Sequence, residues 1–410
     1  MVGVLLCDQS AAFDLCDHHL LLEKLKLMGL EATATAWFMS YLSNRKQSCM
    51  VDGHMSDPLP IPQCGVPQGS IGGPILWLIF TCDQPDVVHN HPVDINRFDR
   101  GCSFSSSMQL SEESRDIINE NGHGCGLFVG YVDDGAFSYA SSNPAVLSTI
   151  MTYKYDKMSD WMKANRLVIN PDKTHLMVMG KRCQKAKRNE VTMIAGTHLI
   201  KPSETEKLLG GLFHQSLNWK VHIRDHKCSL LNQLIGRMNG LRKICRNASF
   251  KTRLMIANGV IMSKLTYLIN LWGGAPQYLL NVLQIQQLVA ARLVCSGDCS
   301  RWSKRKLLTT VGWLSVKQLI FYHTVLQAHK TLSSGLPRPL FYNLSTEYPR
   351  LTRSATAGQI RQTTNNSSSA TFSYRAMLNY NSVPVDIRSG STNSVKCKLK
   401  KWIRTNIPID

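Results

Sequence analysis

Apolar residues in the first half of the chain gather in short runs beside acidic residues. The first run covers residues 2–7 and ends at Asp8, which predicts a buried strand with a carboxylate at its C-terminal end. Over residues 13–27 the apolar positions recur every three or four residues, which predicts a helix. Apolar and aromatic residues on both sides of Asp133 and Asp134 predict two strands joined by a turn that carries both acids.

A segment rich in glycine and proline lies between these two acidic segments. Residues 65–74 contain four glycines and two prolines, which predict a tight loop whose backbone can approach a ligand closely. The apolar residues 75–80 follow, and the run is long enough for a buried helix or strand.

The second half of the chain has helical periodicity and many basic residues. One apolar stripe at helical spacing consists of Leu230, Leu234, Met238, Leu241 and Ile244. Basic residues crowd the same stretch: Lys220, Arg224, Lys227, Arg237, Arg242, Lys243, Arg246, Lys251 and Arg253. This pattern predicts a helix that packs with one face and meets nucleic acid with the other, and an ordinary solvated face is the alternative.

Charge and composition narrow the class of protein. At 410 residues and 43% hydrophobic content, the chain can bury one sizeable core and a second, smaller one. Lys and Arg exceed Asp and Glu by 47 to 28, and the resulting charge of +19 favours a nucleic-acid partner. The thirteen cysteines lack paired spacing, and we see neither a signal peptide nor an apolar run of membrane-spanning length. We therefore expect free thiols, no membrane partner and a nuclear or cytoplasmic location.

The acidic residues themselves suggest a metal site. Buried carboxylates are costly unless a cation neutralises them, and carboxylate oxygens suit Mg²⁺. Asp133 and Asp134 alone also fit an ordinary surface turn. Together with Asp8, they could bridge two Mg²⁺ ions, or Mn²⁺, about 4 Å apart.

Five motifs follow one another in an order that is specific to one family. They are Asp8 with 12–14, Gly65 to Ser70, Tyr131 to Asp134, Asn165 to Thr174, and Lys207 to Gly210. In this order they resemble the palm of a reverse transcriptase of the non-LTR (LINE-like) retrotransposon type, over about residues 1–215. The resemblance implies an α+β fold, in which a palm with an antiparallel sheet and helices is followed by a mostly helical thumb and a C-terminal extension.

The resemblance also implies a role for each motif residue. The metal-binding and catalytic acids would be Asp8, Asp133 and Asp134, and Lys173 would protonate or neutralise the departing pyrophosphate. Phe13 would stack under the incoming sugar and crowd a ribose 2′-hydroxyl, a task suited to a bulky side chain with no polar group. Gln68, Gly69 and Ser70 would contact the nucleotide and template, and Leu208, Leu209 and Gly210 would grip the primer.

The chain also departs from the family pattern. Gly72 stands where a leucine is usual, and residues 85–125 look like a polar insertion. We expect a palm over 1–200, a thumb-like region over 201–300, helices over 301–350, a flexible linker over 351–375, and a basic segment over 376–410 that touches nucleic acid or docks on the thumb. Because Asp8 lies so near the start, we expect a truncated copy without the fingers or the upstream endonuclease.

Two functions remain open at this stage. The chain could be an RNA-directed DNA polymerase acting on an RNA template, a DNA primer or nicked target DNA, and dNTPs. Alternatively, it could be a catalytically inactive nucleic-acid-binding fragment of such an element.

Overall fold

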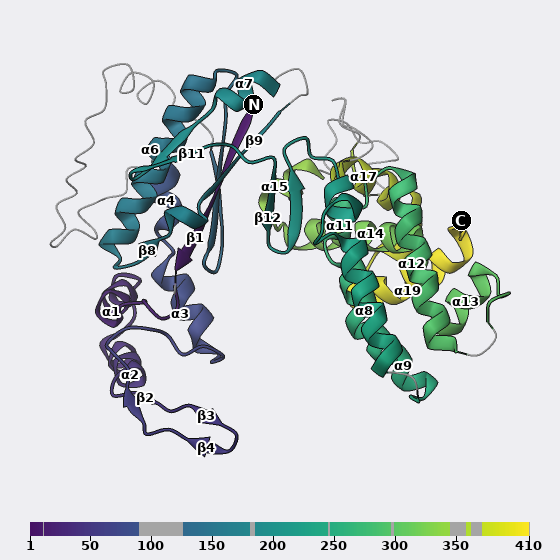
Figure 1. Ribbon diagram of the computed structural model, residues 1–410, viewed down its shortest axis with the longest axis horizontal. Helices are drawn as coiled ribbons and strands as arrows, with labels where there is room; N and C mark the ends of the chain where they lie inside the picture. The colour runs from purple at the N-terminus through teal and green to yellow at the C-terminus, as the bar shows by residue number, and fades with distance from the viewer. Residues whose placement is uncertain are drawn as a thin grey trace. The chain divides into compact units, whose positions relative to one another are not determined.

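The computed structural model describes residues 1–10, 12–89, 126–180, 185–244, 247–296, 299–344, 358–361 and 371–409 (Figure 1). The chain divides into two units, one formed by residues 1–208 and 214–217 and the other by residues 209–213 and 218–410. The first combines an antiparallel sheet with helices, and the described part of the second is almost entirely helical. The predicted α+β class is confirmed.

An antiparallel sheet forms the centre of the first unit (Figure 1). Its middle strand, β1 (Val2–Ser10), pairs with β7 (Asp134–Ala140) on one side and with β9 (His175–Met179) on the other. The strand β6 (Leu127–Tyr131) extends the sheet beyond β7, and β8 (Val168–Ile169) pairs with the last residues of β1. The first apolar run is therefore a central strand, which explains why residues 5–7 are buried.

The helix α6 (Pro144–Ala164) packs against this sheet through β1 and β7. The side chain of Asn143 caps the helix by accepting the N–H of Ala145 at 2.9 Å, and Pro144 occupies the first turn, where its missing N–H costs nothing. A Cβ atom on Gly3 would lie 3.1 Å from Leu147 Cδ1, so the glycine allows the strand and the helix to approach closely.

Two helices flank the glycine-rich loop. The first, α1 (His18–Leu27), starts later than predicted, because the carboxylate of Asp17 caps it by accepting the N–H of Leu20 at 2.9 Å. Residues 13–16 lie outside any helix, so the predicted start near residue 13 is wrong. The second, α3 (Gly72–Phe80), buries one face and leaves Leu78 68% exposed, so its apolar run is only half buried.

The first unit also contains shorter helices and strands. These are α2 (Ala32–Leu42), β2 (Lys46–Gln47), β3 (Met50–Val51), β4 (His54–Met55), β5 (Leu59–Pro60), α4 (Gln84–His89), a 3-10 turn (Pro171–Lys173), α7 (Lys185–Glu190), β10 (Met193–Ala195), β11 (His198–Ile200) and β12 (Thr205–Leu208). The strand β13 (Gly211–His214) lies where the chain passes between the units.

The second unit packs its helices around a core of its own. In chain order they are a π-helical turn (Val221–Asp225), α8 (Leu230–Ile244), α9 (Phe250–Ala257), a second π-helical turn (Asn258–Met262), α10 (Ser263–Thr266), α11 (Ile269–Trp272), α12 (Gln277–Cys295), α13 (Lys304–Val311), α14 (Val316–Ser334), α15 (Arg338–Asn343), α17 (Phe372–Ser382), α18 (Val385–Arg388) and α19 (Thr392–Asn406).

The predicted apolar stripe of α8 packs into this core as far as Leu241. Ile244 was predicted to belong to the stripe but is 74% exposed, so that part of the prediction is wrong. It is the last residue of α8, three residues beyond Leu241.

The helix α12 lies in the same core. Within the described residues it is the one helix long and apolar enough to cross a membrane by length and composition, a test that core helices also pass. Leu279, Leu283 and Val294 are buried in the unit. Its apolar residues do not form one continuous run, because Asn281 and Gln284 interrupt them, and its mean hydropathy is 1.2.

The basic C-terminal segment forms α19, which docks on α14. Leu399 and Ile403 are buried in the common core, and Trp402 lies 5.9 Å from Phe321 between ring centroids. The helices of residues 301–344 and 371–409 share one core with α8 and α12. Most of the predicted insertion and linker lies outside the described residues, although α17 already begins within the predicted linker.

Candidate active site

The hairpin of β6 and β7 carries the paired acids at its turn. Tyr131 pairs with Asp134, so Val132 and Asp133 form a two-residue loop. Val132 has a φ of 59°, a left-handed conformation that is rare for a β-branched residue. Two hydrogen bonds hold the turn: the indole Nε1–H of Trp77 donates to the carbonyl of Val132 at 2.8 Å, and the N–H of Gln9 donates to the carbonyl of Asp133 at 3.3 Å.

The third acid lies directly across the sheet from this hairpin. Asp8 on β1 is the register partner of Asp134 on β7. Residues opposite each other in an antiparallel pair point to the same face, with their Cβ atoms about 4.5–5.5 Å apart. The sheet therefore brings the first acid next to the hairpin that carries the other two.

Lys173 completes this cluster from another segment. Its ammonium group donates to Oδ2 of Asp8 at 2.9 Å. This hydrogen bond and the charge of Asp8 raise the pKa of Lys173 above its ordinary value. The lysine is therefore protonated at neutral pH and lies where a cation is most favourable.

Burial, and then the neighbouring carboxylates, raise the pKa of Asp134. These neighbouring carboxylates are Asp133 and Asp8, whose charges add to the rise. Like charges held this close favour binding of a cation, because the cation removes the repulsion that raises the pKa.

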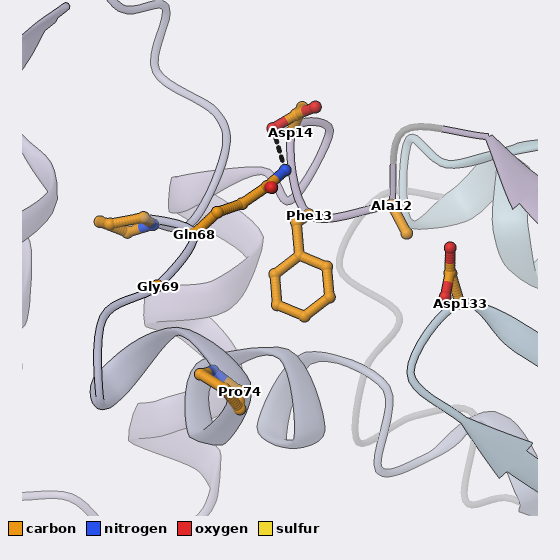
Figure 2. A pocket seen from close by; sticks show the side chains of 8 residues that line it. Ala12, Phe13, Asp14, Gln68, Gly69, Pro74 and Asp133 are labelled. Atoms are coloured by element: carbon orange, nitrogen blue, oxygen red, sulfur yellow. Dashed lines mark hydrogen bonds between the residues drawn. The ribbon is translucent and has the colours of Figure 1, made fainter. Parts of the chain in front are cut away.

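A cavity of about 390 Å³ opens beside the acids. Figure 2 shows Phe13 in its middle, with Gln68 on one side and Asp133 on the other. The remaining lining residues are Ala12, Asp14, Pro67, Gly69 and Pro74. The volume lies in the range of small-molecule sites, which is about 300–1,000 Å³.

The glycine-rich loop is fastened to the turn that carries Phe13. The N–H of Gly65 donates to the carbonyl of Cys16 at 2.7 Å, and the N–H of Val66 donates to the carbonyl of Phe13 at 2.8 Å. Gly65 has a φ of 90°, and a Cβ atom there would lie 3.2 Å from the carbonyl oxygen of Asp14. A glycine is needed at this position for both reasons.

Within the loop, Gln68 and Ser70 point in different directions. The amide of Gln68 donates to Oδ1 of Asp14 at 3.1 Å at the wall of the cavity (Figure 2). The hydroxyl of Ser70 donates to the carbonyl of Pro67 at 2.7 Å and accepts the N–H of Gly73 at 2.9 Å. Ser70 thus stabilises the loop itself and does not line the cavity, although a nucleotide contact was predicted for it.

The predicted primer-grip residues lie at the passage between the two units. Leu208 ends the first unit, while Leu209 and Gly210 begin the second in a turn with positive φ values of 46° and 75°. The hydroxyl of Tyr267 donates to the carbonyl of Leu209 at 2.5 Å. Their predicted contact with a primer stays a prediction.

Comparison with known proteins decides the family. The family model for reverse transcriptase (RNA-dependent DNA polymerase) matches residues 2–241, which is more than half of the chain. The chain belongs to the reverse transcriptase family. The match contains all the motifs from which the resemblance was inferred.

Curated relatives come from mobile elements. The chain is 24% identical over 292 residues to the RNA-directed DNA polymerase from mobile element jockey of Drosophila funebris, covering 71% of this chain and 28% of the relative. It is 25% identical over 322 residues to the probable RNA-directed DNA polymerase from transposon BS of Drosophila melanogaster, covering 77% and 31%. The resemblance to LINE-like reverse transcriptases is confirmed, and the chain spans about 30% of the length of these relatives.

The acids fit the divalent metal ions that reverse transcriptases generally use. Asp8, Asp133 and Asp134 offer hard oxygen ligands from the central strand and the adjacent hairpin. In the described part of the chain, however, no three His, Cys, Asp or Glu side chains are yet spaced to hold an ion.

Sequence reasoning missed Trp77 and Arg166 near this site. Trp77 was recognised only as part of an apolar run, although a buried indole N–H generally needs an acceptor. The guanidinium of Arg166 donates to Oδ2 of Asp17, which ties the Asn165 motif to the start of α1. Nothing in the local pattern around either residue indicates that partnership.

Proposed function

We propose that this chain is an RNA-directed DNA polymerase that extends a DNA primer on an RNA template. The observation that carries the proposal is the register of the sheet, which puts Asp8 opposite Asp134 while Asp133 lines the adjacent cavity. Nucleotidyl transfer needs carboxylates from separate segments at one point, next to a space for the nucleotide.

Three acids, Asp8, Asp133 and Asp134, would hold two Mg²⁺ ions, or Mn²⁺. When bound, the ions would supply activation of the primer 3′-hydroxyl and stabilisation of the leaving pyrophosphate. The protein contributes the geometry, because the pairing of β1 with the hairpin fixes the backbone positions of the three aspartates.

Lys173 would transfer a proton to the departing pyrophosphate. A lysine ammonium is protonated at neutral pH, so the proton is available when the leaving oxygen develops charge. Its hydrogen bond to Asp8 holds it beside the acids until a nucleotide arrives.

Phe13 and Gln68 would bind the incoming dNTP. The Phe13 ring in the cavity would pack against the sugar and leave a ribose 2′-hydroxyl without room or a hydrogen-bond partner. The loop of Gln68 and Gly69 would contact the base and the template, with Gln68 oriented by Asp14.

The second unit would bind the nucleic acid. Of the 47 Lys and Arg in the chain, 28 lie in this unit, against 5 of the 28 Asp and Glu. Its formal charge is therefore +23, and that of the first unit is −4. Phosphate backbones are bound mainly by such charge, so the template–primer duplex, or a nicked target DNA, would be held by α8 and its neighbours. Leu208, Leu209 and Gly210 would grip the primer end.

The charge of the second unit also supports the second candidate function, a catalytically inactive fragment that binds nucleic acid. Binding to nucleic acid would depend on that unit and not on the three acids, so a catalytically inactive binding fragment would retain it. The two candidates differ in one property, which is incorporation of nucleotides.

Primer extension on poly(rA)/oligo(dT) with Mg²⁺ distinguishes them. The wild-type chain should extend the primer, and Asp133→Ala should reduce extension by at least about 10³-fold, because one bridging carboxylate is lost. Asp172→Asn removes an exposed acid next to Lys173 and should leave extension unchanged. Absence of extension by the wild type, with salt-sensitive RNA binding intact, would instead support the inactive fragment.

A further inference from the structure

Trp77 joins two parts of the candidate site that are far apart in the sequence. It lies on α3 and is 4% exposed. Its ring stacks on Phe13 with the centroids 5.3 Å apart and an angle of 25° between the planes. The same indole donates its Nε1–H to the carbonyl of Val132 in the turn of the acidic hairpin at 2.8 Å.

The acceptor of this hydrogen bond is a strained peptide. Val132 has a φ of 59°, and β-branched residues adopt this conformation only where the surroundings impose it. The N–H of Gln9 fixes the next carbonyl, that of Asp133, from β1. The donors from Trp77 and Gln9 therefore hold successive peptides of the turn from which Asp133 and Asp134 project.

The hydrophobic core alone does not require this arrangement. A phenylalanine could fill much of the same space between Phe13 and Phe80, whose ring lies 6.0 Å from that of Trp77. Packing in the core does not require the indole N–H. This group donates to the carbonyl of Val132, the one strained residue of the hairpin.

We propose that Trp77 is a positioning residue that couples the sugar-facing ring of Phe13 to the acidic hairpin. The rigid indole keeps Phe13 at a fixed separation from Asp133, which lies to one side of Phe13 in the same cavity (Figure 2). The inference rests on the proposed function, because it assigns to Trp77 an influence on sugar selection during nucleotide addition.

The test compares two tryptophans that lose the same chemical group. Trp77→Phe removes the indole N–H and keeps an aromatic ring against Phe13. Trp161→Phe is the matched control: Trp161 is 3% exposed, and its Nε1–H donates to Oδ2 of Asp83 at 3.2 Å, an acceptor that is not part of the hairpin. Both variants lose one buried hydrogen bond, so a purely structural effect should be similar in the two.

Two measurements are made on each variant. In primer extension, the ratio of kcat/KM for a dNTP over the matching rNTP should fall about tenfold in Trp77→Phe and stay at the wild-type value in Trp161→Phe. In hydrogen exchange followed by mass spectrometry, amides of residues 131–138 should exchange about tenfold faster in Trp77→Phe and at the wild-type rate in Trp161→Phe.

The exchange measurement needs no catalysis, which separates the two proposals. If the wild type fails to add nucleotides, the proposed function fails, and the exchange rates still show whether Trp77 holds the hairpin. Wild-type exchange and wild-type sugar selection in Trp77→Phe would overturn the inference. Equal effects in both variants would overturn it too, because Trp77 would then be an ordinary core residue.

Discussion

Lys173 donates its ammonium group to Oδ2 of Asp8 at 2.9 Å, across 165 residues of chain. The contact joins the turn after β8 to the central strand. Lys173 in that turn is the residue predicted to assist the departing pyrophosphate. No other basic side chain among the described residues forms an ion pair with one of the three acids.

Replacing this lysine should slow catalysis more than it weakens binding. Lys173→Gln removes the proton donor, and kcat in primer extension should fall about 10²-fold with a smaller change in KM. Lys173→Arg keeps the charge but donates a proton poorly, so its kcat should also fall. Lys201→Gln, an exposed lysine elsewhere in the unit, is the control. An unchanged kcat in Lys173→Gln would exclude the proposed proton transfer.

Replacing either of two adjacent glycines with alanine should change the stability of the protein, but in opposite directions. A Cβ on Gly73 would lie 2.7 Å from the carbonyl oxygen of Pro67, whereas a Cβ on Gly72 meets nothing closer than Tyr41 Oη at 4.0 Å. In urea denaturation, Gly73→Ala should lower the free energy of unfolding by about 1–3 kcal/mol. Gly72→Ala should raise it by up to about 1 kcal/mol, because alanine favours the helix. Equal stability of the two variants would show that the loop adapts to the added methyl group.

The second unit should lose stability in mild acid because of His222. Burial, followed by the nearby charge of Lys264, lowers the pKa of His222 from 6.5 to about 4, and its neutral Nδ1 accepts the N–H of Leu212. The unfolded chain binds a proton below pH 6.5 and the folded chain does not. The stabilisation is therefore present above pH 6.5 and is lost as the pH falls towards 4, by up to about 3 kcal/mol.

Comparing free energies of unfolding at pH 7.5 and pH 5 tests this linkage. His222→Asn should be less stable than the wild type at pH 7.5 and should lose less stability between the two pH values. Some pH dependence should remain, because burial also lowers the pKa of His323 and His329. The same loss in His222→Asn and in the wild type would contradict the assignment.

Asp156 on α6 should have the opposite pH dependence. Its Oδ2 is buried without a hydrogen-bond partner among the described residues, and burial, followed by the charge of Asp160, raises its pKa to about 6. The free energy of unfolding therefore falls as the pH rises from about 3.8 through 6. Asp156→Asn should be more stable at pH 7.5 by about 1 kcal/mol, after allowance for partial exposure, and the gain should vanish near pH 4. The exposed Asp57→Asn should show no such gain.

Local patterns predicted the elements that carry the acids. The apolar run before Asp8 and the paired runs around Asp133 have the composition of strands, and all three strands form. The residue order alone could not give the register that sets Asp8 against Asp134, because antiparallel pairing depends on contacts between distant segments. The resemblance to reverse transcriptases supplied that relationship.

Other features depend on tertiary contacts and could not be predicted. The start of α1 depends on Asp17, whose carboxylate caps the helix and also binds Arg166 from another motif. Ile244 is exposed at the end of α8, although helical spacing puts it on the same face as Leu241. The hydrogen bond from Trp77 connects a helix with a turn 55 residues away.

Binding of Mn²⁺, followed by electron paramagnetic resonance, tests the convergence of the three acids most directly. Asp8→Asn, Asp133→Asn and Asp134→Asn should each weaken binding by at least about tenfold relative to the wild type, because one shared site loses a ligand. Asp172→Asn should bind Mn²⁺ like the wild type. Wild-type affinity in Asp8→Asn, with binding lost in Asp133→Asn, would show that the strand and the hairpin do not form one site and would contradict the proposed mechanism.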